Sequence, residues 1–418
     1  MQDFLEFIRR NMRWLLGGLL LTFFSSFGQT FFISQFSGQI RKAFELTDGQ
    51  FGILYMVGTL ASALTLVKLG KVLDRFSVAG VSFFVVICLA LACLGMSLVS
   101  SVGMLLIVIY GLRLFGQGMM THTSQTAIGR WYFADRGRAI SLTSMGHQLG
   151  EALLPSLVLV LIAGLGWRQT WLVFAIVLVA LALPSIALLM RVEHKPVIDS
   201  SKRSNSVRVR DWTRPEVLRD SAFWILCLGI LAPAFIGTAV FFHQVRIIET
   251  KGWTPGVFAA SFLVLSITTV TFTLTGGWLV DRFGSKRILP TFLIPLAVAC
   301  LVLSLSRQPW TIFVFMFLLG WSYGFSSAIF GTIWPETYGT MHLGAIRAVA
   351  VAAMVFASAL GPGVTGWCID RGIGLDAQLV VMASYCVAAG FAMAFVSRRL
   401  RTRIETQPVY TESVQPSD

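Results

Sequence analysis

The amino-acid sequence predicts an all-α membrane protein with twelve transmembrane helices, arranged as two pseudo-symmetric six-helix bundles. The prediction rests on composition, on the length of the apolar runs and on an internal repeat. Of the 418 residues, 56% are hydrophobic and 13% are charged, and so apolar a chain cannot bury its side chains inside one or two soluble cores. The apolar runs are continuous and of helix length, whereas the strands of a membrane barrel alternate. Lipid is therefore the expected solvent of most of the chain.

Twelve apolar runs are long enough to cross a bilayer as helices, which takes about 20 residues each. Arg9, Arg10 and Arg13 precede the first run as in a signal peptide, but no small-residue cleavage site follows, so this run is predicted to be a retained span. The polar breaks place the predicted spans at residues 14–36, 50–70, 79–99, 104–127, 138–164, 169–190, 221–245, 256–279, 288–304, 309–333, 343–368 and 377–397.

Basic residues gather on one side of these predicted spans. A net charge of +13 would suggest a nucleic-acid partner in a soluble protein, but here the cations follow the span ends, so no nucleic acid is expected. If the N-terminus is inside, 25 Lys and Arg residues fall on the inner side and 7 on the outer side, with Arg113 inside a span. This bias predicts cytoplasmic N- and C-termini.

An internal repeat divides the chain into two halves. The polar stretch 191–220 is predicted to be a cytoplasmic linker between an N-terminal bundle, 1–190, and a C-terminal bundle, 221–397, and 398–418 is predicted to be a cytoplasmic tail. Such repeats are typical of transporters whose substrate site lies between the halves. At a single offset of 207, the four residues Gly70, Asp74, Arg75 and Phe76 align with Gly277, Asp281, Arg282 and Phe283.

The sequence carries no pattern typical of a metal site or of an enzyme. Its six cysteines lie within or beside apolar runs without metal-ligand spacing, so they are predicted to be small hydrophobic side chains, and no cofactor or metal is expected. No Walker loop, HExxH or Gly-x-Ser-x-Gly pattern is present. The chain is therefore predicted not to be an ATP pump or another enzyme.

A short motif occurs twice, after the second and the eighth predicted span. Each copy has a glycine, three residues and then Asp-Arg, at 70–76 and at 277–283. The second copy continues with a glycine and two basic residues, whereas Ser77, Val78 and Ala79 replace them in the first copy. These loops resemble the signature loop of the major facilitator superfamily of secondary transporters.

The resemblance extends to the segments 130–155 and 335–347, which are similar to the bacterial branch near the monocarboxylate and oxalate-formate carriers. It implies a transporter of the bacterial inner membrane in which spans 1, 4, 7 and 10 line the pathway. The sequence departs from many monocarboxylate carriers in span 8, because 255–279 contains no charge.

The carboxylates of the repeated loop are predicted to be gating latches, together with Arg75 and Arg282. A carboxylate is favoured at a helix N-terminus by about 0.3 to 1 kcal/mol. Pseudo-symmetry and the resemblance place Asp281 near the start of span 5 and Asp74 near the start of span 11, around Gly344. The alternative is that each Asp-Arg pair only marks a turn.

Two charged residues are predicted to pair inside the N-terminal half. Arg113 in span 4 and Glu151 in span 5 lie at a similar depth, about 21 to 24 Å from the cytoplasmic ends of their spans. Since an unpaired charge there costs about 2.5 to 3.5 kcal/mol on insertion scales, pairing is the favoured interpretation. The pair is either a permanent structural contact or a site where Glu151 takes up a proton and frees Arg113 for an anionic substrate.

Other polar residues of the spans are candidates for the pathway or for helix packing. His243 and Arg246, near the outer end of span 7, are predicted to have an interfacial or loop role, and His122 and His147 could instead be hydrogen-bonded packing residues. The candidates for the cavity are Gln29, Gln35, Gln117, His122, His147, Trp321 and Tyr323. The candidates for close packing and helix bending are Gly146, Gly150, Pro155, Gly361 and Pro362.

The predicted function is secondary active transport of a small solute, most simply an anionic carboxylate, driven by proton or solute exchange. Two alternatives remain: a drug or lipid exporter of the same fold, and a membrane solute sensor without transport. The expected partners are the lipid bilayer, a small-molecule substrate and, in the coupled version, H+. The chain is expected to act as a monomer.

Overall fold

The computed structural model describes residues 2–132, 136–192, 210–339 and 341–406, and these residues form helices and no strands. Eleven of the described helices are long and apolar enough to cross a membrane, and one bent pair raises the number to twelve. The predicted all-α fold of twelve spans is therefore confirmed.

The N-terminal half contains the first six spans. The first is broken into several short helices, and the fourth and sixth each contain a π-helical segment. The elements are α1 (Gln2–Phe24), η1 (Ser25–Gly28), α2 (Thr30–Ile33), η2 (Ser34–Phe36), α3 (Ser37–Phe44), α4 (Asp48–Leu69), η3 (Gly70–Asp74), α5 (Val78–Leu98), α6 (Val102–Gly111), η4 (Leu112–Met120), α7 (Thr121–Trp131), α8 (Arg136–Leu165), α9 (Trp167–Val177), η5 (Leu178–Ala182) and α10 (Leu183–Met190).

The C-terminal half contains the other six spans, and a short helix precedes it. The elements are α11 (Arg214–Arg219), α12 (Ser221–Phe242), α13 (Gln244–Lys251), α14 (Pro255–Phe283), α15 (Ser285–Ile288), η6 (Leu289–Thr291), α16 (Ile294–Leu305), α17 (Trp310–Tyr338), α18 (Leu343–Asp370) and α19 (Leu375–Thr406).

Two predicted boundaries differ from the structure. The end of the predicted linker, 191–220, contains helix α11, which a capping box at Thr213 and Glu216 starts. The last helix continues to Thr406, beyond the predicted bundle end at 397. The rest of the predicted linker, from 193 to 209, and of the predicted tail, from 407, lies outside the described residues.

The first span is not the single helix predicted over 14–36. The chain bends by 46° between the segments Glu6–Gly28 and Thr30–Phe44. Gly28 faces Gly116 of η4, and a methyl group on either glycine would collide with the backbone of the other helix. The break thus lies where two backbones meet, which is how irregular backbone is accommodated inside a membrane protein.

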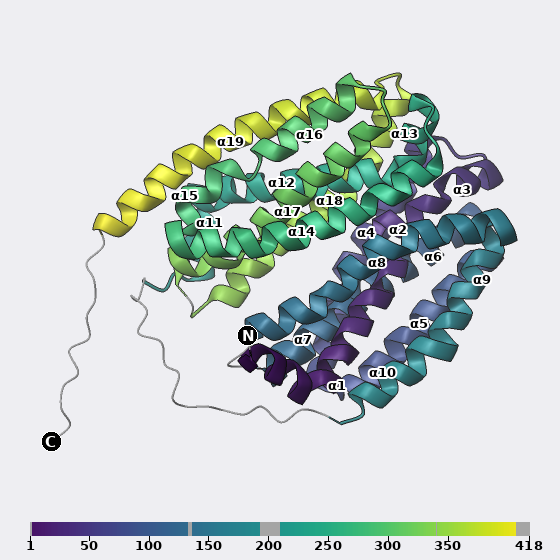
Figure 1. Ribbon diagram of the computed structural model, residues 1–418, viewed down its shortest axis with the longest axis horizontal. Coiled ribbons are helices and arrows are strands. Elements are labelled where there is room, and N and C mark those ends of the chain that lie inside the picture. The colour runs from purple at the N-terminus through teal and green to yellow at the C-terminus, as the bar shows by residue number, and fades with distance from the viewer. Residues whose placement is uncertain (1, 133–135, 193–209, 340, 407–418) are drawn as a thin grey trace.

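The two halves lean together at one end of the molecule and spread apart at the other, as Figure 1 shows. The end where they spread carries both described chain ends, and we call it the terminal side. The opposite end carries the turns 45–47 and 371–374 together with α13, and we call it the far side. Across the halves, α4 packs on α18 and α8 packs on α14.

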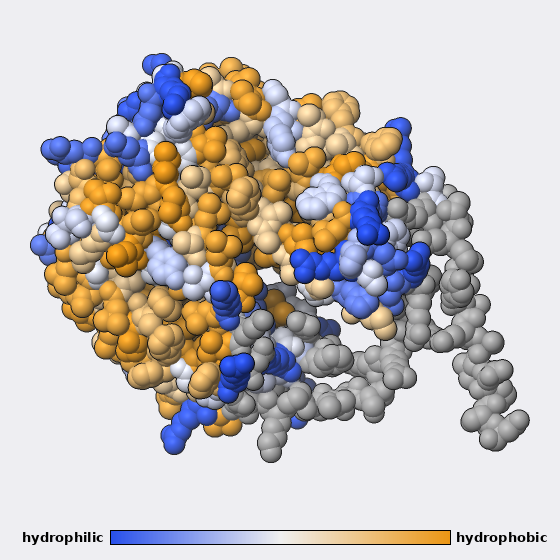
Figure 2. All heavy atoms as spheres, turned by 180° about the vertical axis from the view of Figure 1, so that it is seen from behind, coloured by the Kyte–Doolittle hydropathy of each residue, from blue (hydrophilic) through white to orange (hydrophobic). Residues whose placement is uncertain are grey.

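The outer surface of the bundles is apolar. Figure 2 shows hydrophobic side chains over most of the visible flank and hydrophilic ones gathered towards the ends. Leu64, Val160, Leu274 and Phe391 are each at least 70% exposed, although each lies within a long helix. Lipid is the solvent that makes such exposure favourable.

Several of the predicted packing residues lie at tight helix contacts. A methyl group on Gly146 or Gly150 of α8 would collide with α1 or with the start of η1, and one on Gly361 would collide with α12. Pro155 and Pro362 lie inside α8 and α18. The small residues therefore let the helices approach closely.

Candidate functional site

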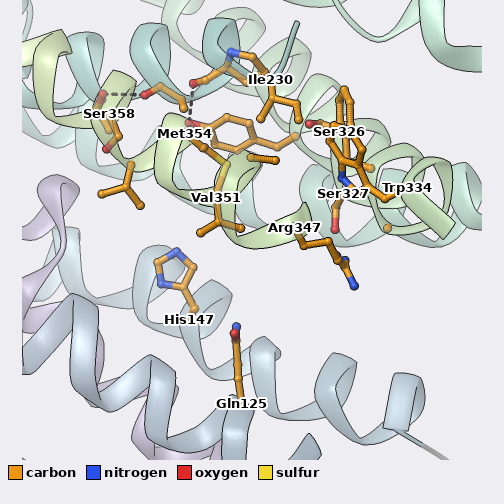
Figure 3. A pocket seen from close by; sticks show the side chains of 18 of the residues that line it. Gln125, His147, Ile230, Ser326, Ser327, Trp334, Arg347, Val351, Met354 and Ser358 are labelled. Atoms are coloured by element: carbon orange, nitrogen blue, oxygen red, sulfur yellow. Dashed lines mark hydrogen bonds between the residues drawn. The ribbon is translucent and has the colours of Figure 1, made fainter. Parts of the chain in front are cut away.

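A cavity of about 640 Å³ lies between the two halves. Its walls come from η4, α7 and α8 of the N-terminal half and from α12, α17 and α18 of the C-terminal half. In Figure 3, His147 and Gln125 point into it from one half, opposite Arg347 and Val351 of the other. The cavity is therefore lined jointly by the two bundles.

The lining of this cavity has an uneven charge. Among the described residues that line it, Arg347 is the one permanently charged side chain, and none is a carboxylate. Hydroxyl groups of serines and the aromatic rings of Tyr323 and Trp334 supply further polar and polarisable surface. The described lining thus combines a cation with hydrogen-bonding and aromatic groups.

Aromatic side chains from both halves meet next to His147. The ring centroid of Phe31 lies 6.0 Å from that of His147 and 5.8 Å from that of Phe262 on α14. Phe241 of α12 packs on Phe262 with centroids 5.1 Å apart. All three phenylalanines are buried, so they form an apolar layer in the contact between the halves.

The sequence prediction of cavity residues matches the lining in part. Gln117, His147 and Tyr323 line the cavity. Trp321 does not, since its ring stacks on Phe272 of α14 at 4.6 Å with an interplanar angle of 5°. Most of the lining residues were not predicted, among them Gln125, Trp334 and Arg347.

The other predicted polar residues lie outside the cavity lining. The carbonyl oxygen of Gln29 accepts the first hydrogen bonds of α2. The Nε2 atom of His122 lies 3.3 Å from the carbonyl oxygen of Gly70, which fits the alternative packing role. Gln35 is buried in η2, and its amide nitrogen has no partner among the described residues.

The predicted ion pair of Arg113 with Glu151 is not formed in this structure. Arg113 is 1% exposed, and its Nη1 donates to the carbonyl oxygen of Gly28 at 2.9 Å and to Oγ1 of Thr30 at 3.5 Å. Its guanidinium carbon lies 5.3 Å from the ring centroid of Tyr55. Among the described residues, no carboxylate oxygen lies within 4.0 Å of it. The break in the first span supplies the carbonyl that takes the place of the expected carboxylate.

Glu151 lies on α8 without a cation beside it. The residue is 6% exposed, and the described residues give it no ion pair. It follows Gly150, which packs on Ser26 of η1. A buried carboxyl group therefore lies on α8 one turn after His147, which lines the cavity.

Among the described residues, Asp281 makes no hydrogen bond or ion pair with the start of α8, and the structure does not test the latch predicted for Asp74. Asp281 and Gly137 are both exposed, Gly344 is exposed too, and the side chain of Asp74 lies outside what the structure describes. The latches remain a prediction for a state in which the terminal side is closed. Here Arg75 is exposed, while Arg282 lies over the ring of Trp278.

Hydrogen bonds from the neighbouring helices hold both loops. Nη1 of Arg130 donates to the carbonyl oxygen of Leu73 at 2.7 Å, and Oγ of Ser285 donates to a carboxylate oxygen of Glu336 at 2.5 Å. Each loop is therefore fixed to the next-but-one helix of its own half. Such contacts keep each half rigid.

His243 lies in the turn between α12 and α13, near the outer end of the span where a loop role was predicted, but it is buried. It is 2% exposed, its Nδ1 lies 3.7 Å from a carboxylate oxygen of Asp48, and its Nε2 lies 3.1 Å from the carbonyl oxygen of Pro362. Arg246 lies 3.8 Å from the same carboxylate. Both residues therefore belong to the contact between the halves on the far side.

Two six-helix bundles around a shared cavity define the architecture of a secondary transporter. The sequence profile of the Major Facilitator Superfamily matches residues 18–272 and 244–416. The chain belongs to this superfamily.

Several transporters are similar to the chain. An uncharacterized MFS-type transporter of Bacillus subtilis, YcxA, is 24% identical over 374 residues, which cover 84% of this chain and 88% of that protein. A probable sulfoacetate transporter of Cupriavidus necator, SauU, is 27% identical over 39% of this chain and 38% of its own length. The oxalate:formate antiporter of Oxalobacter formigenes is 23% identical over 62% of this chain and 63% of its own length.

Solved structures share the fold. A bacterial homolog of the human lysosomal transporter Spinster, in an inward-facing and unoccupied conformation, gives a TM-score of 0.73 at 18% identity, over 96% of this chain and 99% of that one. A mutant of the nucleoside transporter NupG gives a TM-score of 0.66 at 14% identity, over 92% of this chain and 99% of that one.

We predict that neutralising the two buried charges of the N-terminal half has unequal effects. Arg113→Gln removes a charged hydrogen bond to the Gly28 carbonyl and should destabilise the detergent-solubilised protein by about 1.5 to 3 kcal/mol. Glu151→Gln breaks no ion pair and should leave the thermal midpoint within a few degrees of the parent. Equal losses in the two variants, with recovery in the exchange Arg113→Glu plus Glu151→Arg, would contradict the observed partners.

Proposed function

We propose that this transporter moves a small organic anion, such as a carboxylate, by alternating access of the central cavity. The observation that carries the proposal is the positive charge that Arg347 of α18 contributes to the cavity wall. Arg347 is exposed to the cavity, so its attraction for an anionic ligand is partly screened by water and acts together with the hydrogen bonds that a guanidinium donates. The cavity volume of about 640 Å³ suits a small-molecule site.

The similar transporters support the anionic substrate class. The two relatives whose names include a substrate carry sulfoacetate, or oxalate and formate, and all three are small organic anions. The guanidinium of arginine binds carboxylate and sulfonate oxygens through its fork of N–H donors. The guanidinium of Arg347 in the cavity wall could bind an anion of either kind.

We assign the terminal side to the cytoplasm, because the basic residues predicted on the inner side belong to it. In this assignment the cavity faces inward and the chain is a multi-pass protein of the bacterial inner membrane. One chain supplies both walls of the cavity, so the monomer is the proposed unit of transport. Neither a cofactor nor a catalytic step is part of the proposal.

We further propose that Glu151 binds the coupling proton. A charged carboxylate buried away from any cation is costly inside a membrane, and holding a proton removes that cost. His147 lies one turn before it on α8, and both His147 and Tyr323 of the other half line the cavity. Separation of the halves on the far side would bring water to Glu151 and release the proton there. In symport the proton crosses the membrane together with the anion, and in antiport it crosses in the opposite direction.

The substrate proposal is tested by uptake into proteoliposomes from a panel of small carboxylates and sulfonates. Arg347→Gln should lower transport efficiency about tenfold or more, since a hydrogen bond between charged groups contributes about 1.5 to 3 kcal/mol. Arg287→Gln is the matched control, because Arg287 is an exposed cation outside the cavity. Efflux of lipophilic drugs or lipids, with no uptake of any anion, would favour the exporter alternative. Binding without transport would favour the sensor.

The coupling proposal predicts a specific loss in Glu151→Gln. This variant should still exchange the anion across the membrane with equal pH on both sides, but a pH gradient should no longer drive accumulation. The measurement is uptake of labelled anion with and without an imposed gradient, with Gln148→Glu as a control for the position of the carboxyl group on α8. Gradient-driven accumulation that survives in Glu151→Gln would rule out this proton site.

A further inference from the structure

The two halves touch most closely on the far side, where the backbones of α4 and α18 meet. A methyl group on Gly52 of α4 would collide with the carbonyl oxygen of Pro362, and one on Gly366 of α18 would collide with the carbonyl oxygen of Asp48. At these two points the contact is backbone against backbone, and the side chain of Met56 packs on Gly363 next to them. We call Gly52, Pro362, Gly366 and Asp48, together with Gly49, the glycine seam.

A carboxylate from one half caps the first helix turn of the other at the end of this seam. Oδ2 of Asp370, the last residue of α18, accepts hydrogen bonds from Oγ1 of Thr47 at 2.6 Å and from the backbone N–H of Gly49 at 3.1 Å. Thr47 and Gly49 lie at the start of α4, where unpaired N–H groups and the positive end of the helix dipole attract an anion.

A second carboxylate extends the same contact. Asp48, in the first turn of α4, lies 2.8 Å from Nη1 of Arg41 within its own half and 3.7 Å from His243 of the other half. Nearby, Nε2 of Gln244 in the C-terminal half donates to Oγ of Ser34 at 2.6 Å. The far side is thus closed by these polar contacts, by the backbone contacts of the seam and by the ring of Phe51 stacked on that of Phe242.

We propose that the glycine seam is the far-side gate of the transporter and that Asp370 is its latch. The inference rests on alternating access and not on the identity of the substrate. At Gly52 and Gly366 the seam loses only close backbone contacts when the halves part, whereas beside it the ring of Phe51 must also leave that of Phe242. Asp370 is largely exposed, so water replaces its hydrogen bonds when the halves part. Both features make the closure reversible.

The test is the rate at which an impermeant thiol reagent, added from the far side, labels a cysteine in the cavity wall. Ser358→Cys, in a background whose six native cysteines are replaced, supplies this probe. Asp370→Asn should raise the labelling rate about two- to fivefold, which is the effect of a charge at a helix terminus. Gly366→Val should raise it more, because the added methyl groups hold the seam apart.

Two neighbouring variants are matched controls. Asp376 pairs with Lys251 at 3.0 Å within the C-terminal half, so Asp376→Asn removes a far-side carboxylate that does not cross the halves. Gly374 has open space around it, so Gly374→Val adds the same bulk outside the seam. Both controls should label at the parental rate.

Parental labelling in Asp370→Asn and Gly366→Val, with both proteins folded by size-exclusion chromatography, would overturn the gate. Thr47→Val removes the hydroxyl donor on the other half and should match Asp370→Asn if Gly366→Val fails to fold. No substrate is present in these measurements. The labelling rates therefore test the gate even if the protein transports no anion. Failure of the substrate proposal would appear only in the uptake measurements.

Discussion

The backbone contact of α4 with α18 on the far side determines how the rest of the molecule is arranged. Because the two helices meet at glycines, the halves come together there and diverge towards the terminal side. The space left between them becomes the cavity, whose wall is shared by both halves. When the halves rock as rigid bodies about the middle of the membrane, closing the terminal side separates this contact, and this coupling is the physical basis of alternating access.

The buried guanidinium of Arg113 links the N-terminal half to this contact. The membrane offers no water to a charged group, so the cost of burying Arg113 is offset by a free backbone carbonyl and an aromatic ring. The carbonyl is that of Gly28, made available where the first span breaks. The ring is that of Tyr55, which packs on Phe242 of the other half with centroids 4.7 Å apart. We therefore interpret Arg113 as a positioning residue for the far-side contact.

The sequence was sufficient to predict the architecture but only part of the site. Apolar length, charge bias and the repeat predicted twelve spans, because each of these signals is local to the chain. The cavity depends on how the halves pair, so Arg347 was missed, although its place near the start of span 11 could have suggested a wall residue. The partner of Arg113 was also missed. It is a backbone carbonyl freed by a helix break, and the residue types of the sequence do not mark such an acceptor. Asp370 was missed because it caps a helix 321 residues away in sequence.

The central claim is that the far side opens as the terminal side closes, and distances between paired spin labels test it most directly. One pair, Lys42→Cys with Ile373→Cys, reports the far side, and a second pair, Ser141→Cys with Arg287→Cys, reports the terminal side. In nanodiscs, a transported anion or a lower pH should move population from short to long distances in the first pair. The same fraction should move from long to short distances in the second pair. Distances that lengthen together in both pairs, or a far-side pair that stays short while transport proceeds, would contradict the account.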